Sequence, residues 1–317
     1  MTSPAPGGVA DGAGATAGQA ADPAEGDGAT ADQEAAPAVA SSPPEPALIV
    51  LRPGRAPLGR YVTEVWRYRD LGGVLARREI KLRYRQTVLG GAWVILQPLL
   101  SAGILSFVFG RIARLPTDGV PAFLFTFAGF LYWSVFASSV TRGTTSLIGN
   151  AALISKIYFP RLLLPLSTAW AVIVDFAVVF VLLLAMLAVE GLVPDARILL
   201  VPVWVGLLLL VAQGLGAFFA TLSVSYRDVP LIVPVAVQLG LFASPVAYSA
   251  SVVPAEYVTL YNLNPVAPLL GAFRWSVLGT AAPPGRFLAL AAVEAVALFL
   301  AGSALLQRGE AKFADVV

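Results

Sequence analysis

A series of long apolar stretches with almost no charged residues is the feature that most constrains this chain. A helix needs about 20 predominantly apolar residues to cross a hydrocarbon core that is about 30 Å thick. Inside that core every backbone N–H and C=O group must be paired within the protein, which a helix achieves by itself. The sequence therefore predicts an all-α polytopic membrane protein with six transmembrane helices. Their predicted boundaries are 92–110, 121–140, 162–189, 198–224, 229–249 and 287–306.

The composition excludes several classes of site. Of the 317 residues, 57% are hydrophobic and only 13% are charged, whereas a soluble domain carries about 25% charged residues. The chain contains neither Cys nor His. Disulfides, thiolate metal sites and Cys nucleophiles are therefore excluded, and the commonest general base and metal ligand is missing. No metal site and no nucleic-acid partner is predicted.

Catalytic motifs are missing as well. No G-x-x-x-x-G-K-[ST] phosphate loop is present, so the chain is not expected to bind ATP by that mechanism. The sequence contains no G-x-S-x-G motif and no clustered pair of carboxylates. Asp175 and Glu294 are the only acids near the middle of predicted spans, whereas a proton-coupled carrier places more ionisable groups there. The chain is therefore predicted to be no enzyme and to bind no cofactor, and either another protein supplies its energy or it is passive.

Two segments of opposite charge precede the first predicted span. Residues 1–50 are rich in Ala, Gly and Pro and contain acids but no Lys or Arg, which predicts a disordered acidic tail. This tail lacks the basic start and apolar run of a signal peptide. Residues 51–91 are basic, with apolar residues at helical spacing, and predict an amphipathic helix on the cytoplasmic membrane surface. The alternative is a solvated basic stretch.

The segment between the last two predicted spans is too apolar and too rich in proline for an ordinary loop. It runs from 250 to 286 and contains five prolines. We expect short helices there that enter the membrane partway from the extracellular side and are covered by protein or line a wet cavity.

The distribution of basic residues predicts the orientation of the chain. With the N-terminus in the cytoplasm, 16 of the 21 Lys and Arg residues fall on the inner side and 5 on the outer side. Cytoplasmic loops carry the excess of positive charge in membrane proteins. Six spans with both termini in the cytoplasm satisfy this bias.

Six short blocks of sequence, in order, resemble the membrane subunits of type II ABC exporters, which move O-antigen, teichoic acid or galactan on a lipid carrier. Together the blocks span about residues 60–317; the acidic tail lies outside the pattern. The blocks are RDLGGVLARREIKLRYRQTVLGGAWVILQPLL (69–100), KIYFPRLLLPLSTAW (156–170), SYRDVPLIVP (225–234), FASPVAY (242–248), NPVAPLLGAFRW (264–275) and GEAKFADVV (309–317).

The resemblance implies a fold, partners and a function. It implies six transmembrane helices with an N-terminal interface helix and re-entrant extracellular helices between spans five and six. Two copies would form a channel in the bacterial cytoplasmic membrane, and an ATP-binding cassette ATPase subunit, which binds ATP and Mg, would dock on each. The substrate would be a polyprenyl-pyrophosphate-linked polysaccharide. The alternatives are an exporter of a drug or small lipid, a membrane-embedded transferase, and a passive channel or scaffold.

Two groups of candidate residues lie on the predicted cytoplasmic side. A basic cluster just before the first span is placed to meet lipid headgroups or a lipid pyrophosphate, the alternative being simple positive-inside anchoring. It consists of Arg77, Arg78, Lys81, Arg83 and Arg85. The loop 142–161 is the predicted coupling segment to an ATPase, through Lys156, Tyr158 and Arg161; the alternative is an ordinary turn.

Two further groups are predicted inside the membrane and near its outer surface. Phe130, Tyr132 and Trp133 are candidates for a sugar path, because aromatic faces stack on sugar rings; an interfacial aromatic belt is the alternative. An outer gate is predicted where the fifth span is broken and where the following short helices begin. The gate residues are Ser244, Pro245, Asn264 and Pro265.

The orientation is testable because the chain has no native Cys. We expect a single Cys at Gly7 or Ala314 to stay unlabelled by a membrane-impermeant maleimide in intact cells, and a Cys within 250–285 to be labelled. Labelling at either terminal position in intact cells would refute the predicted topology.

Overall fold

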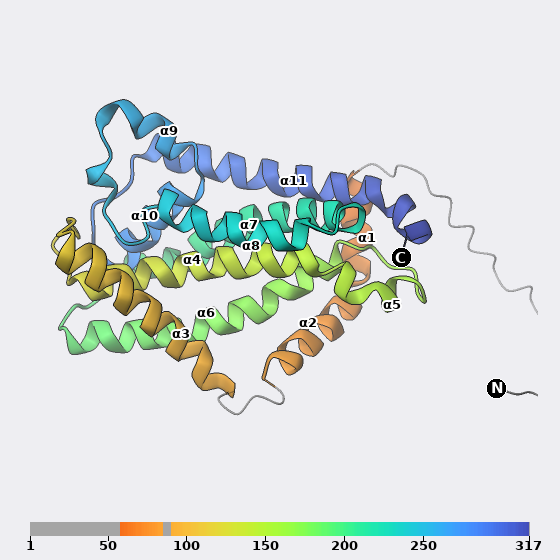
Figure 1. Cartoon of the computed structure of the whole chain (residues 1–317), viewed down its shortest axis with the longest axis horizontal. Helices are drawn as coiled ribbons and strands as arrows, with labels where there is room; N and C mark the ends of the chain where they lie inside the picture. The colour runs from red at the N-terminus through yellow and green to blue at the C-terminus, as the bar shows by residue number, and fades with distance from the viewer. Residues whose placement is uncertain (1–57, 85–89, 317) are drawn as a thin grey trace, which may run out of the picture. The chain divides into compact units, whose positions relative to one another are not determined.

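The computed structural model describes residues 58–84 and 90–316, in which every regular element is a helix (Figure 1). The predicted acidic tail 1–50 lies outside the described residues, as does Arg85. In chain order the helices are α1 (Leu58–Arg67), α2 (Arg69–Tyr84), α3 (Gly90–Leu105), η1 (Ser106–Ile112), α4 (Ala122–Thr145), η2 (Ile148–Asn150), α5 (Ala151–Ile154), α6 (Leu163–Val189), η3 (Ala196–Leu200), α7 (Val201–Ser225), α8 (Val229–Ala243), η4 (Ala250–Val252), η5 (Ala255–Tyr257), α9 (Val258–Asn262), α10 (Val266–Leu278) and α11 (Gly285–Val316).

Five segments among the described residues are long and apolar enough to cross a membrane. They agree with five of the six predicted stretches, although α4 and α11 continue beyond the predicted ends. The five segments are Ala92–Ile112, Ala122–Thr145, Leu163–Val189, Ala196–Ser225 and Gly285–Glu310.

The remaining predicted span, 229–249, forms a shorter helix than expected. Helix α8 has 15 residues and ends at Ala243, so it is about 22 Å long, less than the hydrocarbon thickness of about 30 Å. Its end has a local cause. Ser244 has extended backbone angles, because the ring of the following Pro245 disfavours the helical conformation in the residue before it.

Helix α4 is the buried centre of the bundle. In its most apolar stretch 72% of the residues are buried, against 17–44% in the other four candidate spans. It packs against α3, α6, α7, α8 and α10, and Figure 1 shows it running between α6 and α7. The other spans leave much of their apolar surface uncovered, as expected for helices that face lipid.

Glycines allow the closest helix contacts. Gly214 of α7 meets Gly302 of α11, and a Cβ on Gly302 would overlap the backbone of Gly214. A Cβ on Gly143 of α4 would lie 2.9 Å from the Cα of Gly216 in α7. Since lipid removes the hydrophobic driving force between helices, such close backbone packing is a main source of attraction.

Helix α2 lies along α6, and α1 and α2 meet at Tyr68. Leu75 and Ala76 are buried against the bundle, whereas Trp66 and Val74 are exposed. The apolar residues of this segment therefore divide between an inner and an outer face.

The glycine contacts make a prediction with a control in the same helix. Gly214→Ala places a Cβ 2.5 Å from the backbone of Leu298 and should destabilise the protein by about 1–3 kcal/mol through overpacking. Gly206→Ala in α7 meets nothing within 4 Å and should leave stability unchanged. Thermal unfolding in detergent, followed by size-exclusion chromatography, measures both. Equal melting temperatures for the two variants would contradict this account of the α7–α11 contact.

Candidate functional site

A cavity of about 500 Å³ lies among α3, α4, α6 and α8, with the end of α2 at its side. One face of α4 supplies a large share of its wall. Residues three or four positions apart share a helix face, and this face bears hydroxyls and two aromatic rings at that spacing. The α4 residues of the wall include Phe130, Trp133, Ser134, Ala137, Ser138, Thr141 and Arg142.

The cavity wall combines aromatic rings with amides and hydroxyls. Trp133 lies 5.0 Å from Phe136, centroid to centroid, and a Cβ on Gly240 of α8 would lie 3.2 Å from the Trp133 indole. Gly240 therefore leaves room for the ring. Gln97 of α3 and Gln238 of α8 also line the wall. A ligand-binding site is typically a concavity lined by apolar and aromatic side chains together with several well-placed polar groups.

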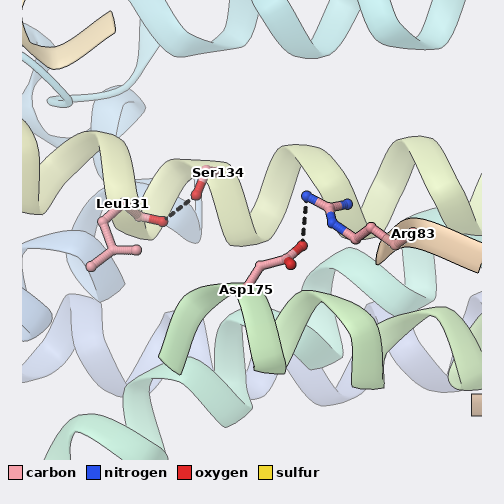
Figure 2. Close-up of polar contacts among 4 residues, drawn as sticks. All are labelled: Arg83, Leu131, Ser134 and Asp175. Carbon is pink, nitrogen blue, oxygen red and sulfur yellow. Dashed lines mark hydrogen bonds and ion pairs between the residues drawn. The ribbon is translucent and has the colours of Figure 1, made fainter. Parts of the chain in front are cut away.

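The cavity also holds an ion pair within the helical bundle. The Arg83 guanidinium lies 2.7 Å from the Asp175 carboxylate, with 25% and 13% of the two side chains exposed. Figure 2 shows Arg83 reaching from the end of α2 to Asp175 on α6, beside Ser134 of α4. The Ser134 hydroxyl donates to the Leu131 carbonyl at 2.7 Å. Arg142 of α4 is the third charged residue that lines the wall in the part of the chain that the structure describes.

The predicted sugar-path residues separate into two environments. Phe130 and Trp133 line the cavity, whereas Tyr132 is fully buried on another face of α4. Its hydroxyl donates to the Trp204 carbonyl at 2.7 Å, and its ring stacks on Phe273. Consecutive residues of a helix point about 100° apart, so Tyr132 and Trp133 face different neighbours. The structure thus gives Tyr132 a packing position outside the cavity.

The predicted basic cluster also separates into one residue that lines the cavity and others that do not. Arg83 lines the cavity, whereas Arg77, Arg78 and Lys81 are exposed on α2. Arg78 donates to the Asn150 side chain at 2.9 Å, which ties α2 to the segment before α5. The fifth member, Arg85, lies outside the described residues.

Two of the three predicted coupling residues, Tyr158 and Arg161, lie next to Glu310 near the C-terminal end of α11. The Arg161 backbone N–H donates to the Glu310 carboxylate at 3.0 Å, and the Tyr61 hydroxyl of α1 donates to the same oxygen at 2.6 Å. Burial and the nearby Glu310 carboxylate raise the pKa of Tyr61, so its hydroxyl remains a donor. Lys156 and Tyr158 are exposed. The Tyr158 hydroxyl also donates to the Glu64 carboxylate of α1 at 3.5 Å. Arg161 is therefore part of a partly buried junction, whereas Lys156 and Tyr158 lie at the surface.

The predicted gate residues are brought together by hydrogen bonds. The Asn264 side-chain amide donates to the Ser244 hydroxyl at 2.9 Å, and its carbonyl oxygen accepts from the Val266 N–H at 3.1 Å, at the start of α10. Pro265 directly precedes that helix. The segment after α8 is thereby fastened to the start of α10.

Arg274 of α10 holds the same segment and was not among the predicted site residues. Its buried guanidinium donates to the carbonyls of Pro245, Val246 and Phe125 and lies 3.7 Å from the centre of the Phe125 ring. The side chain is 3% exposed. An arginine inside a short apolar helix is the signal that sequence reasoning could have used, because such residues are costly in a membrane unless they have a role.

A family model described as ABC-2 type transporter matches residues 71–278. The chain belongs to the ABC-2 type transporter family. The matched segment runs from α2 to the end of α10 and contains every residue that lines the cavity. It also contains the gate residues and Arg274.

This ABC-2 type protein is similar to curated permeases. It is 31% identical to the O-antigen export system permease protein RfbA of Myxococcus xanthus over 261 residues, which cover 81% of this chain and 99% of that protein. It is 27% identical to an RfbA permease of Klebsiella pneumoniae over 249 residues, 78% of this chain and 95% of that protein. It is 26% identical to the polysialic acid transport protein KpsM of Escherichia coli over 207 residues, 63% and 78% of the two chains.

The Arg274 contacts predict how this ABC-2 protein responds to substitution. Arg274→Lys keeps the charge but has no planar fork, so some of the three carbonyls lose their donor at a cost of about 1–3 kcal/mol each. A Cys at the buried position Val246 should react faster with maleimide in the Arg274→Lys background. Arg286→Lys, outside this network, is the matched control. Equal reaction rates in all backgrounds would mean that Arg274 does not hold this segment.

Proposed function

We propose that this chain is the permease subunit of an ATP-driven exporter of lipid-linked polysaccharide in the bacterial cytoplasmic membrane. The observation that carries the proposal is the cavity, which, among the described residues, is lined by aromatic rings, amides, hydroxyls and more cationic than anionic groups from several helices. The names of the related permeases for O-antigen and polysialic acid support the same substrate class. A small lipid or drug, the alternative substrate, has no such support.

The chemistry of the cavity residues suits a polysaccharide that moves through the cavity and exchanges its contacts as it moves. Phe130 and Trp133 offer ring faces to the apolar faces of sugars, and Gln97 and Gln238 offer amides that both donate and accept hydrogen bonds. Hydroxyl and amide groups can exchange partners along a polymer with little net cost, since protein–sugar hydrogen bonds replace those to water. The wall therefore favours passage over tight binding.

The basic cluster of α2 suits the lipid pyrophosphate. Arg77, Arg78 and Lys81 are exposed on the helix that leads to the cavity, and Arg83 stands at the cavity itself. Guanidinium groups bind phosphate oxygens bidentately, whereas Lys acts as a point charge. In this proposal the exposed residues attract the headgroup, and α2 lies at the membrane interface.

The proposed assembly contains two copies of the chain and two ATPase subunits. The channel forms between the two copies, with α8 as the fifth of six spans, both termini in the cytoplasm, and η4 to α10 as the re-entrant extracellular segment. ATP and Mg are bound in the ATPase, because this sequence has no phosphate loop. Exposed Lys156 and Tyr158 contact the ATPase, and the Arg161–Glu310–Tyr61 junction passes its movement to α1 and α11.

The test is export from a strain in which the chromosomal copy is deleted and the full chain is supplied together with the ATPase subunit of the proposed complex. Trp133→Ala removes one of the aromatic rings that line the cavity and should lower surface polysaccharide about fivefold or more, the equivalent of about 1 kcal/mol of lost aromatic contact. Trp170→Ala on α6 removes an exposed ring outside the cavity and should export normally.

Copurification of the ATPase with each variant serves as the assembly control. No surface polysaccharide from the wild-type complex, or full export by Trp133→Ala at normal expression, would overturn the proposed role of the cavity.

A further inference from the structure

The Arg83–Asp175 ion pair lies where charged groups are costly. Asp175 belongs to the middle of α6, a candidate membrane span, and the pair lines the cavity, with the two side chains mostly covered. Ionisable residues at such depth mark ligand or ion pathways more often than stabilising contacts, and a buried ion pair is weak evidence for stability.

Arg142 gives the same cavity a second guanidinium. It lies four residues after Ser138 on the α4 face that lines the wall, so both point to the same space. Within residues 58–84 and 90–316 no carboxylate forms an ion pair with it. Among the described residues, two guanidinium groups and one carboxylate line the cavity, a surplus of one positive charge.

This arrangement of charges suits the reversible binding of an anion. A guanidinium cannot shed its proton, so an empty cavity leaves Arg83 in need of a negative partner. Asp175 provides one from inside the protein. A phosphate or pyrophosphate group can take its place, because its oxygens match the planar fork of Arg and carry more charge than a single carboxylate.

We propose that Asp175 is a resident competitor that holds Arg83 in the empty cavity and is displaced by a phosphate-class anion bound between Arg83 and Arg142. The inference deepens the proposed function, on which it rests, and assigns the anionic part of the substrate to this point of the cavity. Asp175 is then a positioning residue that prevents the anion from binding too tightly to leave.

The direction in which Asp175→Asn changes the affinity for the anion distinguishes this role from a purely structural one. If the ion pair only stabilises the fold, Asp175→Asn leaves an uncompensated charge and weakens both stability and ligand binding. If Asp175 competes with the ligand, Asp175→Asn frees Arg83 and tightens anion binding. Coupling of close charge pairs across interfaces predicts a change of about tenfold or more.

The binding measurement uses a Cys in the cavity. Ser138 lines the wall and is partly exposed, and Ser138→Cys is the sole Cys of the chain. Isolated membranes that contain the full chain are titrated with farnesyl pyrophosphate before a maleimide pulse, and label on this chain is read after electrophoresis. Farnesol, which has the same tail without the anion, reports protection by the lipid part alone.

In the Ser138→Cys background we expect farnesyl pyrophosphate, but not farnesol, to protect the Cys. Arg142→Gln should raise the farnesyl pyrophosphate concentration that protects half of the Cys about tenfold or more, and Arg142→Lys should partly restore the protection. Asp175→Asn should lower that concentration about tenfold. Arg227→Gln, an exposed cation outside the cavity, should leave it unchanged. Equal protection by farnesol, no effect of Arg142→Gln, or weaker binding in Asp175→Asn would each overturn the assignment.

Export of polysaccharide by the same variants separates this inference from the proposed function. Asp175→Asn should export less than wild type despite tighter binding, because the anion leaves more slowly. If the wild-type complex exports polysaccharide while substitutions of Arg142 and Asp175 leave protection of the Cys by farnesyl pyrophosphate unchanged, the proposed anion site is wrong and the proposed function stands. If the wild-type complex exports none, the proposed function fails whatever the protection shows.

Discussion

A hydrocarbon core offers no hydrogen-bond partner to a backbone N–H or C=O group, and this constraint governs the whole molecule. It makes each crossing a helix and leaves irregular backbone only where protein covers it. The segment after α8 illustrates the second case. Pro245 ends the helix, and the freed carbonyls of Pro245 and Val246 are taken up by the buried Arg274. One costly cation thus satisfies backbone groups that lipid would leave unpaired.

Helix α4 shows how a single buried span serves two purposes. Gly143 brings it close to α7, and Tyr132 packs into the core through its ring and its bond to the Trp204 carbonyl. Another face of α4 turns Trp133, Ser138 and Arg142 to the cavity. The rigid side of the helix therefore holds the polar side in place, as a binding wall requires.

The candidate site was partly predictable from residue type. Residue type predicts Arg83, because cations suit a lipid pyrophosphate, and Trp133, because aromatic faces stack on sugar rings; both line the cavity. Tyr132 was chosen by the same reasoning but faces the core, because residue type does not give the rotation of a helix. Arg142 was assigned to a loop, although α4 continues to Thr145. The pairing of Arg83 with Asp175 joins residues 92 positions apart, which no local pattern indicates.

The sequence by itself determined the class of the protein, five candidate membrane spans and its family likeness, because the length and apolarity of a span are local properties that decide whether a helix can cross the hydrocarbon core. The tertiary structure decided the rest. It made α8 a shorter helix than the predicted span 229–249, sorted neighbouring side chains into core and cavity, and gave Arg83 and Arg274 their partners. These outcomes depend on which helix faces which, and helix packing in a membrane is set by shape and close contact rather than by the hydrophobic pattern.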